Sequence, residues 1–226
     1  MATRVKHCGI ARVEDAQLAV ELGAWALGMI FWPESPRACP VDVATEIGQQ
    51  QRRRAELSGV FVNQSLEEIA AIAELVPLSM VQLHGDEGPA FCAEVARRTG
   101  TKVIKAERVR SKADLQALTA FRSVDFHLVD AHVEGMRGGT GQTVDRRILL
   151  DRLSEDVPLI LSGGLTAENV GEAIAELHPF AVDVASGTEA EPGVKDPAKL
   201  RAFSEAVAQA DHEIAPEEIA SEEIAS

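Results

Sequence analysis

The stretch "VPLILSGGLTAENVGEAIAELHPFAVDVASG" (157–187) combines two short apolar runs with a segment of helical spacing between them. The apolar runs, 157–163 and 180–186, have the length and the β-branched content of buried strands. The segment between them, 166–177, is rich in Ala, Glu and Leu, which favour a helix. The stretch therefore predicts a strand, a helix and a second strand, with glycines where each strand ends.

The same alternation recurs along the chain as far as residue 209. Helical stretches follow each of six further predicted strands, at 3–9, 25–31, 57–62, 79–84, 101–106 and 124–130. Eight units with nearly continuous apolar strands predict a parallel sheet covered by helices, and the number eight favours closure into a (β/α)8 TIM barrel over residues 1–210. An open doubly wound sheet is the competing fold. It would need a glycine fingerprint after its first strand, but "CGIARVED" (8–15) contains no G-x-G-x-x-G.

Two of the predicted helices start with a capping signature. Ser65 is followed three residues later by Glu68, which is the pattern of a capping box. Thr166 is followed at the same spacing by Asn169, which makes only a partial match. We expect both helices to begin directly after these residues.

The composition indicates a soluble globular protein that works in the cytoplasm. Of 226 residues, 46% are hydrophobic, and the longest apolar runs are too short to span a bilayer, so no membrane association is expected. The amino-terminal sequence shows no secretory signal. Three cysteines lie far apart without a C-x-x-C pair, which predicts free thiols and no metal site.

The chain is acidic, with a formal net charge of -14, and this disfavours a general nucleic-acid partner, whose phosphates need a basic surface. Part of the charge lies in a carboxyl-terminal tail, 211–226, which holds six acidic residues and no Lys or Arg. The repeated "EEIAS" of this tail is typical of a solvated extension, disordered or weakly helical. We expect any bound phosphate to be small and held locally.

Active sites of TIM barrels lie at the carboxyl ends of the strands. At the last two predicted strand ends, Gly163 and Gly164 come just before a helix start, and Ser186 with Gly187 follows the final strand. Backbone N–H groups in such loops can hold an anion, and the loops after strands seven and eight are the usual phosphate site of this fold. Together the two motifs predict phosphate binding, whereas either one alone would fit a tight turn equally well.

Four other polar side chains lie at or near strand ends. Asp130 could exchange a proton or anchor its loop, and Asp183, inside an apolar strand, must find a hydrogen-bonding partner. His84 is a lone histidine, which is more often a packed residue than a catalyst. Arg37, in a proline-rich loop, could form a bidentate ion pair with a carboxylate or be an ordinary solvated arginine. His132 and Arg137 are weaker candidates in the loop after Asp130.

Cys8 ends the first predicted strand. Alternation of side chains along a strand puts Lys6 and Cys8 on one face, and Val5 and His7 on the other. An inward-facing Cys8 would lie in the barrel mouth across from Asp130. The alternative is a buried cysteine that packs as a small hydrophobic residue.

Up to about residue 205 the chain resembles the phosphoribosylanthranilate isomerase family of tryptophan biosynthesis, in both the order and the spacing of its motifs. The motifs that carry the resemblance are "KHCGIA" (6–11), "GMIFWPESPRACP" (28–40), "GVFVNQS" (59–65), "VQLHGDE" (81–87), "LVD" (128–130), "GGTGQTVD" (138–145), "LSGGLTAENV" (161–170), "DVASGTE" (183–189) and "PGVKD" (192–196). One departure is His7, which stands where an aliphatic residue is usual; it would face the layer between barrel and helices and would need a polar partner there.

The resemblance implies an Amadori rearrangement of N-(5-phosphoribosyl)anthranilate to 1-(2-carboxyphenylamino)-1-deoxyribulose 5-phosphate, with no cofactor or metal. It implies that Asp130 is the general acid and Cys8 the general base, and that Arg37 holds the anthranilate carboxylate. The glycines 163, 164 and 187 and Ser186 would hold the phosphate, while His84 and Asp183 make supporting contacts. The family contains monomers and homodimers, so either state is expected.

Two alternatives remain open from the sequence. Another phosphosugar barrel, such as an aminoaldose isomerase of histidine biosynthesis or a ribulose-phosphate epimerase, would be expected to carry a second catalytic aspartate or several metal-binding histidines. A phosphate-binding or regulatory protein could instead keep the barrel without catalysis. The presence of both Cys8 and Asp130 favours the isomerase.

Overall fold

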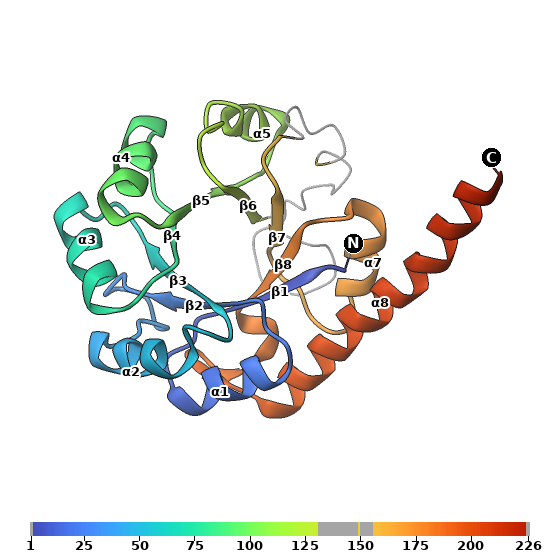
Figure 1. Cartoon of the computed structure of the whole chain (residues 1–226), viewed down its shortest axis with the longest axis horizontal. Coiled ribbons are helices and arrows are strands. Elements are labelled where there is room, and N and C mark those ends of the chain that lie inside the picture. The colour runs from blue at the N-terminus through green and yellow to red at the C-terminus, as the bar shows by residue number, and fades with distance from the viewer. Residues whose placement is uncertain (1, 131–148, 150–155, 225–226) are drawn as a thin grey trace.

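The chain forms a closed barrel of parallel strands in the computed structural model, which describes residues 2–130, 149 and 156–224. Each strand pairs with the next one in the sequence, and the eighth pairs with the first (Figure 1). The strands of the barrel are β1 (Arg4–Cys8), β2 (Ala26–Ile30), β3 (Glu56–Phe61), β4 (Met80–Leu83), β5 (Lys102–Arg108), β6 (Phe126–Asp130), β7 (Leu159–Ser162) and β8 (Ala181–Val184). The predicted TIM barrel is confirmed, and each strand of the barrel overlaps a predicted one.

Helices surround the ring of strands on the outside (Figure 1). Those in the described ranges are α1 (Val13–Glu21), α2 (Val41–Gln51), α3 (Leu66–Leu75), α4 (Pro89–Thr99), α5 (Lys112–Leu118), α7 (Val170–Leu177) and α8 (Pro197–Ile224). Each follows a strand because a parallel neighbour can be reached only by a crossover. A short hairpin, β9 (Glu189–Glu191) with β10 (Val194–Lys195), is inserted between β8 and α8.

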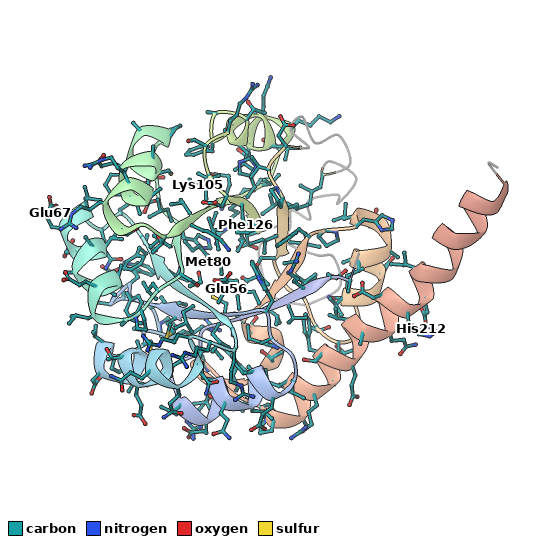
Figure 2. All side chains as sticks on the ribbon, viewed as in Figure 1. Glu56, Glu67, Met80, Lys105, Phe126 and His212 are labelled. Atoms are coloured by element: carbon teal, nitrogen blue, oxygen red, sulfur yellow. The ribbon has the colours of Figure 1, made fainter. Side chains whose placement is uncertain are left out.

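The apolar residues divide between two layers. Inward-facing residues of the strands, among them Met80 and Phe126, fill the interior of the barrel (Figure 2). A larger set lies between the strands and the helices and forms two clusters, one around α1 to α4 and one around α7 and α8. The interior is therefore a packed core, and open space for a ligand is expected only at its ends.

The helix starts agree with the sequence in one case and differ in the other. Ser65 and Glu68 form the full capping box at the start of α3. The predicted start after Thr166 is wrong, because α7 begins at Val170. The Asn169 side chain instead accepts from the Thr166 N–H at 2.9 Å and donates to the Gly164 carbonyl at 3.0 Å, which holds residues 164–169 in a turn ahead of the helix.

Helix α8 continues through residue 210 without a break. The Asp211 carboxylate accepts hydrogen bonds of 2.7 Å from both the backbone N–H and the hydroxyl of Thr3, just before β1. Ile214 packs, partly buried, against the apolar cluster around α7 and α8. Contact with the barrel therefore extends onto the first part of the acidic segment. Helices in the described part of the chain include none long and apolar enough to cross a membrane.

Candidate active site at the carboxyl ends of the strands

Parallel pairing brings the predicted catalytic residues to one end of the barrel. Cys8 is the last residue of β1 and Asp130 the last of β6. His84 comes directly after β4, and Asp183 lies near the end of β8. Because every strand runs in the same direction, these four side chains surround the same mouth.

Cys8 points into the barrel, as strand alternation predicted, and is 6% exposed. Gly28 stands opposite it on β2 in the parallel register. A Cβ atom at position 28 would lie 2.9 Å from the Cys8 sulfur and 3.0 Å from the Lys6 ammonium nitrogen, so the two groups occupy the space that this glycine leaves. Burial raises the pKa of the Cys8 thiol, while the positive charges of Lys6 and Lys195 act against that rise.

Asp183 finds the partner that its burial requires in Lys6. The Lys6 ammonium donates to one carboxylate oxygen at 2.7 Å, and the hydroxyl of Ser162 donates to the other at 3.2 Å. Lys6 is fully buried and the Asp183 side chain is 6% exposed. The pair arises because barrel closure sets β8 beside β1 with these two residues in register.

The Asp130 carboxylate lies nearer to solvent, with 24% of its side chain exposed. Arg108, on β5, has its Nε 3.9 Å from a carboxylate oxygen. At this distance and exposure the ion pair is weak, which leaves the carboxyl group accessible to a ligand. Asp130 thus has the position of a group that can exchange a proton with a molecule in the mouth.

His84 lies close enough to both aspartates of the mouth to be influenced by their charge. Its Nδ1 is 3.1 Å from the side-chain nitrogen of Gln82, which is also on the inner face of β4. Burial lowers the pKa of His84, although the negative charges of Asp130 and Asp183 act to raise it. The structure therefore favours a neutral imidazole that is held by Gln82 and close enough to both carboxylates to feel their charge.

Arg37 forms a bidentate ion pair with Glu189 of the β9–β10 hairpin. The guanidinium donates through Nε at 2.8 Å and through Nη2 at 2.8 Å to the carboxylate. This pairing is the largest cause of a raised pKa for Arg37. Among the described residues no hydrogen bond uses Nη1, so the outer edge of the guanidinium can receive a second carboxylate.

Lys195 joins the two strand ends on either side of the barrel closure. Its ammonium donates to the Cys8 carbonyl at 2.7 Å and to the Ala185 carbonyl at 2.9 Å, and lies 3.5 Å from the Glu189 carboxylate. Burial lowers the pKa of Lys195. The lysine thus fixes the backbone of Cys8 and supports the carboxylate that holds Arg37.

The loops after β7 and β8 lie against each other. Gly163 and Gly164 both have positive φ, at 105° and 63°, which side chains other than glycine rarely adopt. Gly187 lies in a short 3-10 turn, Ser186–Thr188, and a Cβ there would collide with the Leu165 carbonyl oxygen. The predicted phosphate residues are therefore close together in space, although α7 begins farther along the chain than expected.

His7 faces the layer between the barrel and the helices, as expected from its place on β1. Its ring packs edge-on against Phe203 of α8, with the centroids 6.1 Å apart. Neither ring nitrogen has a hydrogen-bond partner in the described part of the chain, so the expected polar partner is not found there. Burial lowers the pKa of His7 to about 3, and the charges of Lys195 and Lys6 act in the same direction.

The sequence predicted no role for three residues that contact the candidate site: Lys6, Glu189 and Lys195. Strand alternation puts Lys6 on the same face as Cys8, and Glu189 and Lys195 fall within the motifs 183–189 and 192–196. The local sequence does not indicate which residues these three contact. His132, Arg137 and the motif 138–145 lie outside the described residues. All three cysteines are free, as expected. Residues 2–130, 149 and 156–224 contain no group of His, Cys, Asp and Glu arranged to hold a metal ion.

Comparison with known proteins identifies the family. Residues 5–206 match the family model "N-(5'phosphoribosyl)anthranilate (PRA) isomerase". The N-(5'-phosphoribosyl)anthranilate isomerase of Pseudomonas fluorescens is 46% identical over 207 residues, which cover 91% of this chain and 98% of the relative.

Solved structures give the same result. The phosphoribosyl anthranilate isomerase of Thermotoga maritima has a TM-score of 0.82 at 40% identity, over 92% of this chain and 99% of that one. Monomers generated from this dimeric enzyme have a TM-score of 0.80 at 38% identity. A PRA isomerase in complex with reduced 1-(o-carboxyphenylamino)-1-deoxyribulose 5-phosphate has a TM-score of 0.80 at 38% identity, with the same coverage of both chains. The chain belongs to the N-(5'-phosphoribosyl)anthranilate isomerase family.

Proposed function

We infer that this chain catalyses the isomerisation of N-(5'-phosphoribosyl)anthranilate in tryptophan biosynthesis, and we propose that Cys8 and Asp130 are its base and acid. Family membership over almost the whole barrel supports the reaction. The observation that carries the assignment of roles is the meeting of a thiol and a carboxyl group at one barrel mouth, at the ends of β1 and β6. These groups suit the two proton transfers that the rearrangement requires.

In the first step the Asp130 carboxylic acid gives its proton to the ring oxygen of the ribose. The bond between that oxygen and C1' breaks, and the nitrogen lone pair forms the C1'=N bond of a protonated Schiff base. This cation makes the neighbouring C2'–H acidic, so a base of moderate strength suffices for the next step. The greater exposure of Asp130 fits a group that must be protonated again after each turnover.

In the second step the Cys8 thiolate removes the C2' proton. The electrons of the C2'–H bond form a C1'=C2' double bond, and those of the C1'=N bond return to the nitrogen. The resulting enolamine tautomerises to the ketone, which is the open-chain ribulose product. Cys8 is held firmly enough to act at one carbon atom, because Lys195 fixes its carbonyl.

The two charged ends of the substrate determine how it lies between these groups. We propose that the outer edge of the Arg37 guanidinium binds the anthranilate carboxylate, while Glu189 holds the inner edge. The phosphate would bind to the backbone of Gly163, Gly164 and Gly187 and to the Ser186 hydroxyl. Fixing both ends places the ribose near acid and base, and orientation of this kind contributes much of an enzyme's rate enhancement.

The roles of His84 and Asp183 are proposed as supporting ones. His84, neutral and held by Gln82, can hydrogen-bond a ribose hydroxyl in the mouth. Asp183, occupied by Lys6 and Ser162, supports the base side of the site. We propose that the enzyme works in the cytoplasm, where its three free cysteines stay reduced, and that it is a monomer or a homodimer.

A fluorescence assay that follows the loss of phosphoribosylanthranilate tests the assignment. Cys8→Ala and Asp130→Asn should each lower kcat by ~10²- to 10⁴-fold, which is the usual contribution of a general acid or base. Cys92→Ala, at another buried cysteine, and Asp42→Asn, on α2, are the matched controls and should keep wild-type activity. Full activity in both site variants would refute the proposed roles. Binding of substrate without turnover by the wild type would indicate a binding protein.

A further inference from the structure

Lys6 is a fully buried charge inside the barrel, and the proposed chemistry gives it no part. Ala26 and Ala181 line the neighbouring part of the barrel interior, so the surroundings of Lys6 there are apolar. Such a charge is costly unless it is paired, and its carboxylate partner is Asp183. An apolar residue at position 6 with a neutral one at 183 would fill the same space at lower electrostatic cost. We therefore expect the buried Lys6–Asp183 ion pair to have a function beyond packing.

The geometry around Gly28 indicates that function. The Cys8 sulfur and the Lys6 ammonium nitrogen both approach the point where a side chain at 28 would begin, at 2.9 Å and 3.0 Å. Cys8 and Lys6 are two residues apart on one strand and face the same way. The missing side chain on β2 therefore lets the ammonium and the sulfur share one small space.

We propose that Lys6 is a positioning residue for the base: its ammonium, anchored by Asp183, lies beside the Cys8 sulfur and stabilises the thiolate that removes the C2' proton. The inference rests on the proposed function, because it gives Cys8 the role of base. Lys6 keeps its proton throughout. Cys8 loses a proton to water before substrate binds and gains one from C2' during the reaction, so charge and protons balance.

Other charged groups face Cys8 and have other contacts to satisfy. Lys195, from β10, donates hydrogen bonds to two main-chain carbonyls and forms an ion pair with Glu189 of the hairpin. Arg37, from the loop after β2, is held by the same glutamate. Asp183, from β8, opposes thiolate formation by its own charge, but it is itself paired with the Lys6 ammonium at 2.7 Å. Lys6 is therefore the cation best placed to stabilise the sulfur.

The proton equilibria of the two groups agree with this arrangement. Burial acts to lower the pKa of Lys6, but the charges of Asp183 and Cys8, together with their hydrogen bonds to it, outweigh burial and raise the pKa. Lys6 is thus a permanent cation at neutral pH. For Cys8, burial raises the pKa, and Lys6 is the largest of the influences that lower it.

Ultraviolet thiolate absorbance across a pH titration tests the proposal. Each protein is compared with its own Cys8→Ala counterpart, so that the difference reports Cys8 alone. The variant is the double substitution Lys6→Met with Asp183→Asn, which leaves no unpaired buried charge. We expect the midpoint for Cys8 to rise, because Lys6 influences the sulfur more than Asp183 does. The rise should be about 1 pH unit or less, below the ~1 to 3 units of a single nearby opposite charge, because the variant also removes the opposing charge of Asp183. The lower limb of the pH profile of kcat/KM should move by the same amount.

Two further variants make the result decisive. Gly28→Ala keeps both side chains but places a methyl group between them, so it should also raise the midpoint, and it stands in if the double variant does not fold. Lys105→Met removes another buried lysine, one that donates to the Gly85 carbonyl at 2.6 Å and faces the helices, and should leave the midpoint unchanged. An unchanged midpoint in both test variants would overturn the proposal.

The outcome is separable from the test of the proposed function. If Cys8→Ala keeps its activity, Cys8 is not the base, and the inference falls with that role whatever the titration shows. If Cys8→Ala is inactive while the double variant keeps both its midpoint and its pH profile, the role of Cys8 stands and only the role of Lys6 is refuted.

Discussion

Arg37 and Glu189 form a bidentate ion pair directly over the end of β1. A Cβ at Gly9 would lie 3.0 Å from the Arg37 side chain and 3.2 Å from the Glu189 carboxylate, so the pair lies against this glycine. The Glu189 side chain is 4% exposed, whereas that of Arg37 is 25% exposed. The buried Glu189 carboxylate therefore holds the more exposed arginine at the mouth, beside Gly9, the residue that follows the proposed base.

Substitution of Glu189 should weaken substrate binding more than it slows catalysis. Glu189→Gln keeps the shape but removes the charge that orients the guanidinium, and we expect KM for phosphoribosylanthranilate to rise about tenfold, equivalent to the loss of one charge-assisted contact. Steady-state kinetics measures the split between KM and kcat. Glu191→Gln, on the exposed side of the same hairpin, is the control and should change neither constant. A fall in kcat at constant KM would contradict this role.

The buried His7 should make stability depend on pH. Its pKa is about 3 in the folded protein against 6.5 for the free side chain, so between these values the unfolded state binds a proton that the native state does not. Stability is therefore lost as pH falls from about 6.5 toward 3. From pH 7 to pH 5 the loss is roughly 2 kcal/mol, at 1.36 kcal/mol per pKa unit.

Urea unfolding at the two pH values measures this effect. His7→Val should lose less stability on acidification than the wild type, by the amount that the histidine contributes. His178→Gln, at the end of α7, is a control that should behave as the wild type does. Equal losses in His7→Val and wild type would show that His7 does not titrate on unfolding.

Glycine at position 187 should be required for the phosphate loops. In Gly187→Ala the new methyl group would collide with the Leu165 carbonyl oxygen and force apart the loops after β7 and β8. We expect weaker inhibition by inorganic phosphate and a loss of stability of about 1–3 kcal/mol, as for other overpacked sites. Inhibition constants and thermal unfolding measure the two effects.

The matched control is Gly171→Ala, in helix α7, where a Cβ would lie 3.7 Å from Ala210 in ordinary contact. It should leave phosphate inhibition unchanged and stabilise the protein by up to about 1 kcal/mol, because alanine favours a helix over glycine. If Gly187→Ala behaved like this control, the close approach of the two loops would not matter for binding.

Removal of Lys195 should destabilise the barrel where it closes. Lys195→Met would leave the carbonyls of Cys8 and Ala185 without this donor and the buried Glu189 with less positive charge. Loss of one partner of a buried pair costs about 3–5 kcal/mol. Denaturant unfolding measures the cost, and Lys102→Met, which removes the surface pair with Glu56, should cost at most about 1 kcal/mol.

The fold could be predicted from the sequence because its signal is local and repeated. Each strand is a short apolar run, and each run is followed by a helical pattern, so the count of eight and the position of strand ends such as Cys8 and Asp130 follow directly. The predicted start of α7, directly after Thr166, was wrong for a reason that lies in the local hydrogen bonding. The amide of Asn169 fits a capping position but is used to close the turn after Gly164, and spacing alone does not distinguish the two.

The partners of the site residues could not be predicted in this way. Lys6 and Asp183 are 177 residues apart and meet only because β8 pairs with β1. Arg37 and Glu189, separated by 152 residues, meet through a hairpin whose strands are too short to show a pattern. A sequence motif indicates that such residues matter, but the contact that explains each of them exists only after the barrel has closed.

The hydrogen bonds between Thr3 and Asp211 join the start of the first strand to the last helix. The two segments are therefore already adjacent before any linker is added, and the chain is suited to circular permutation at this point. A short linker from α8 back to Thr3 would let the protein be opened at a connection on the face opposite the mouth, such as the one between α4 and β5 at Gly100. Such a permuted enzyme would begin and end far from its proposed catalytic groups and still assemble the same ring of strands.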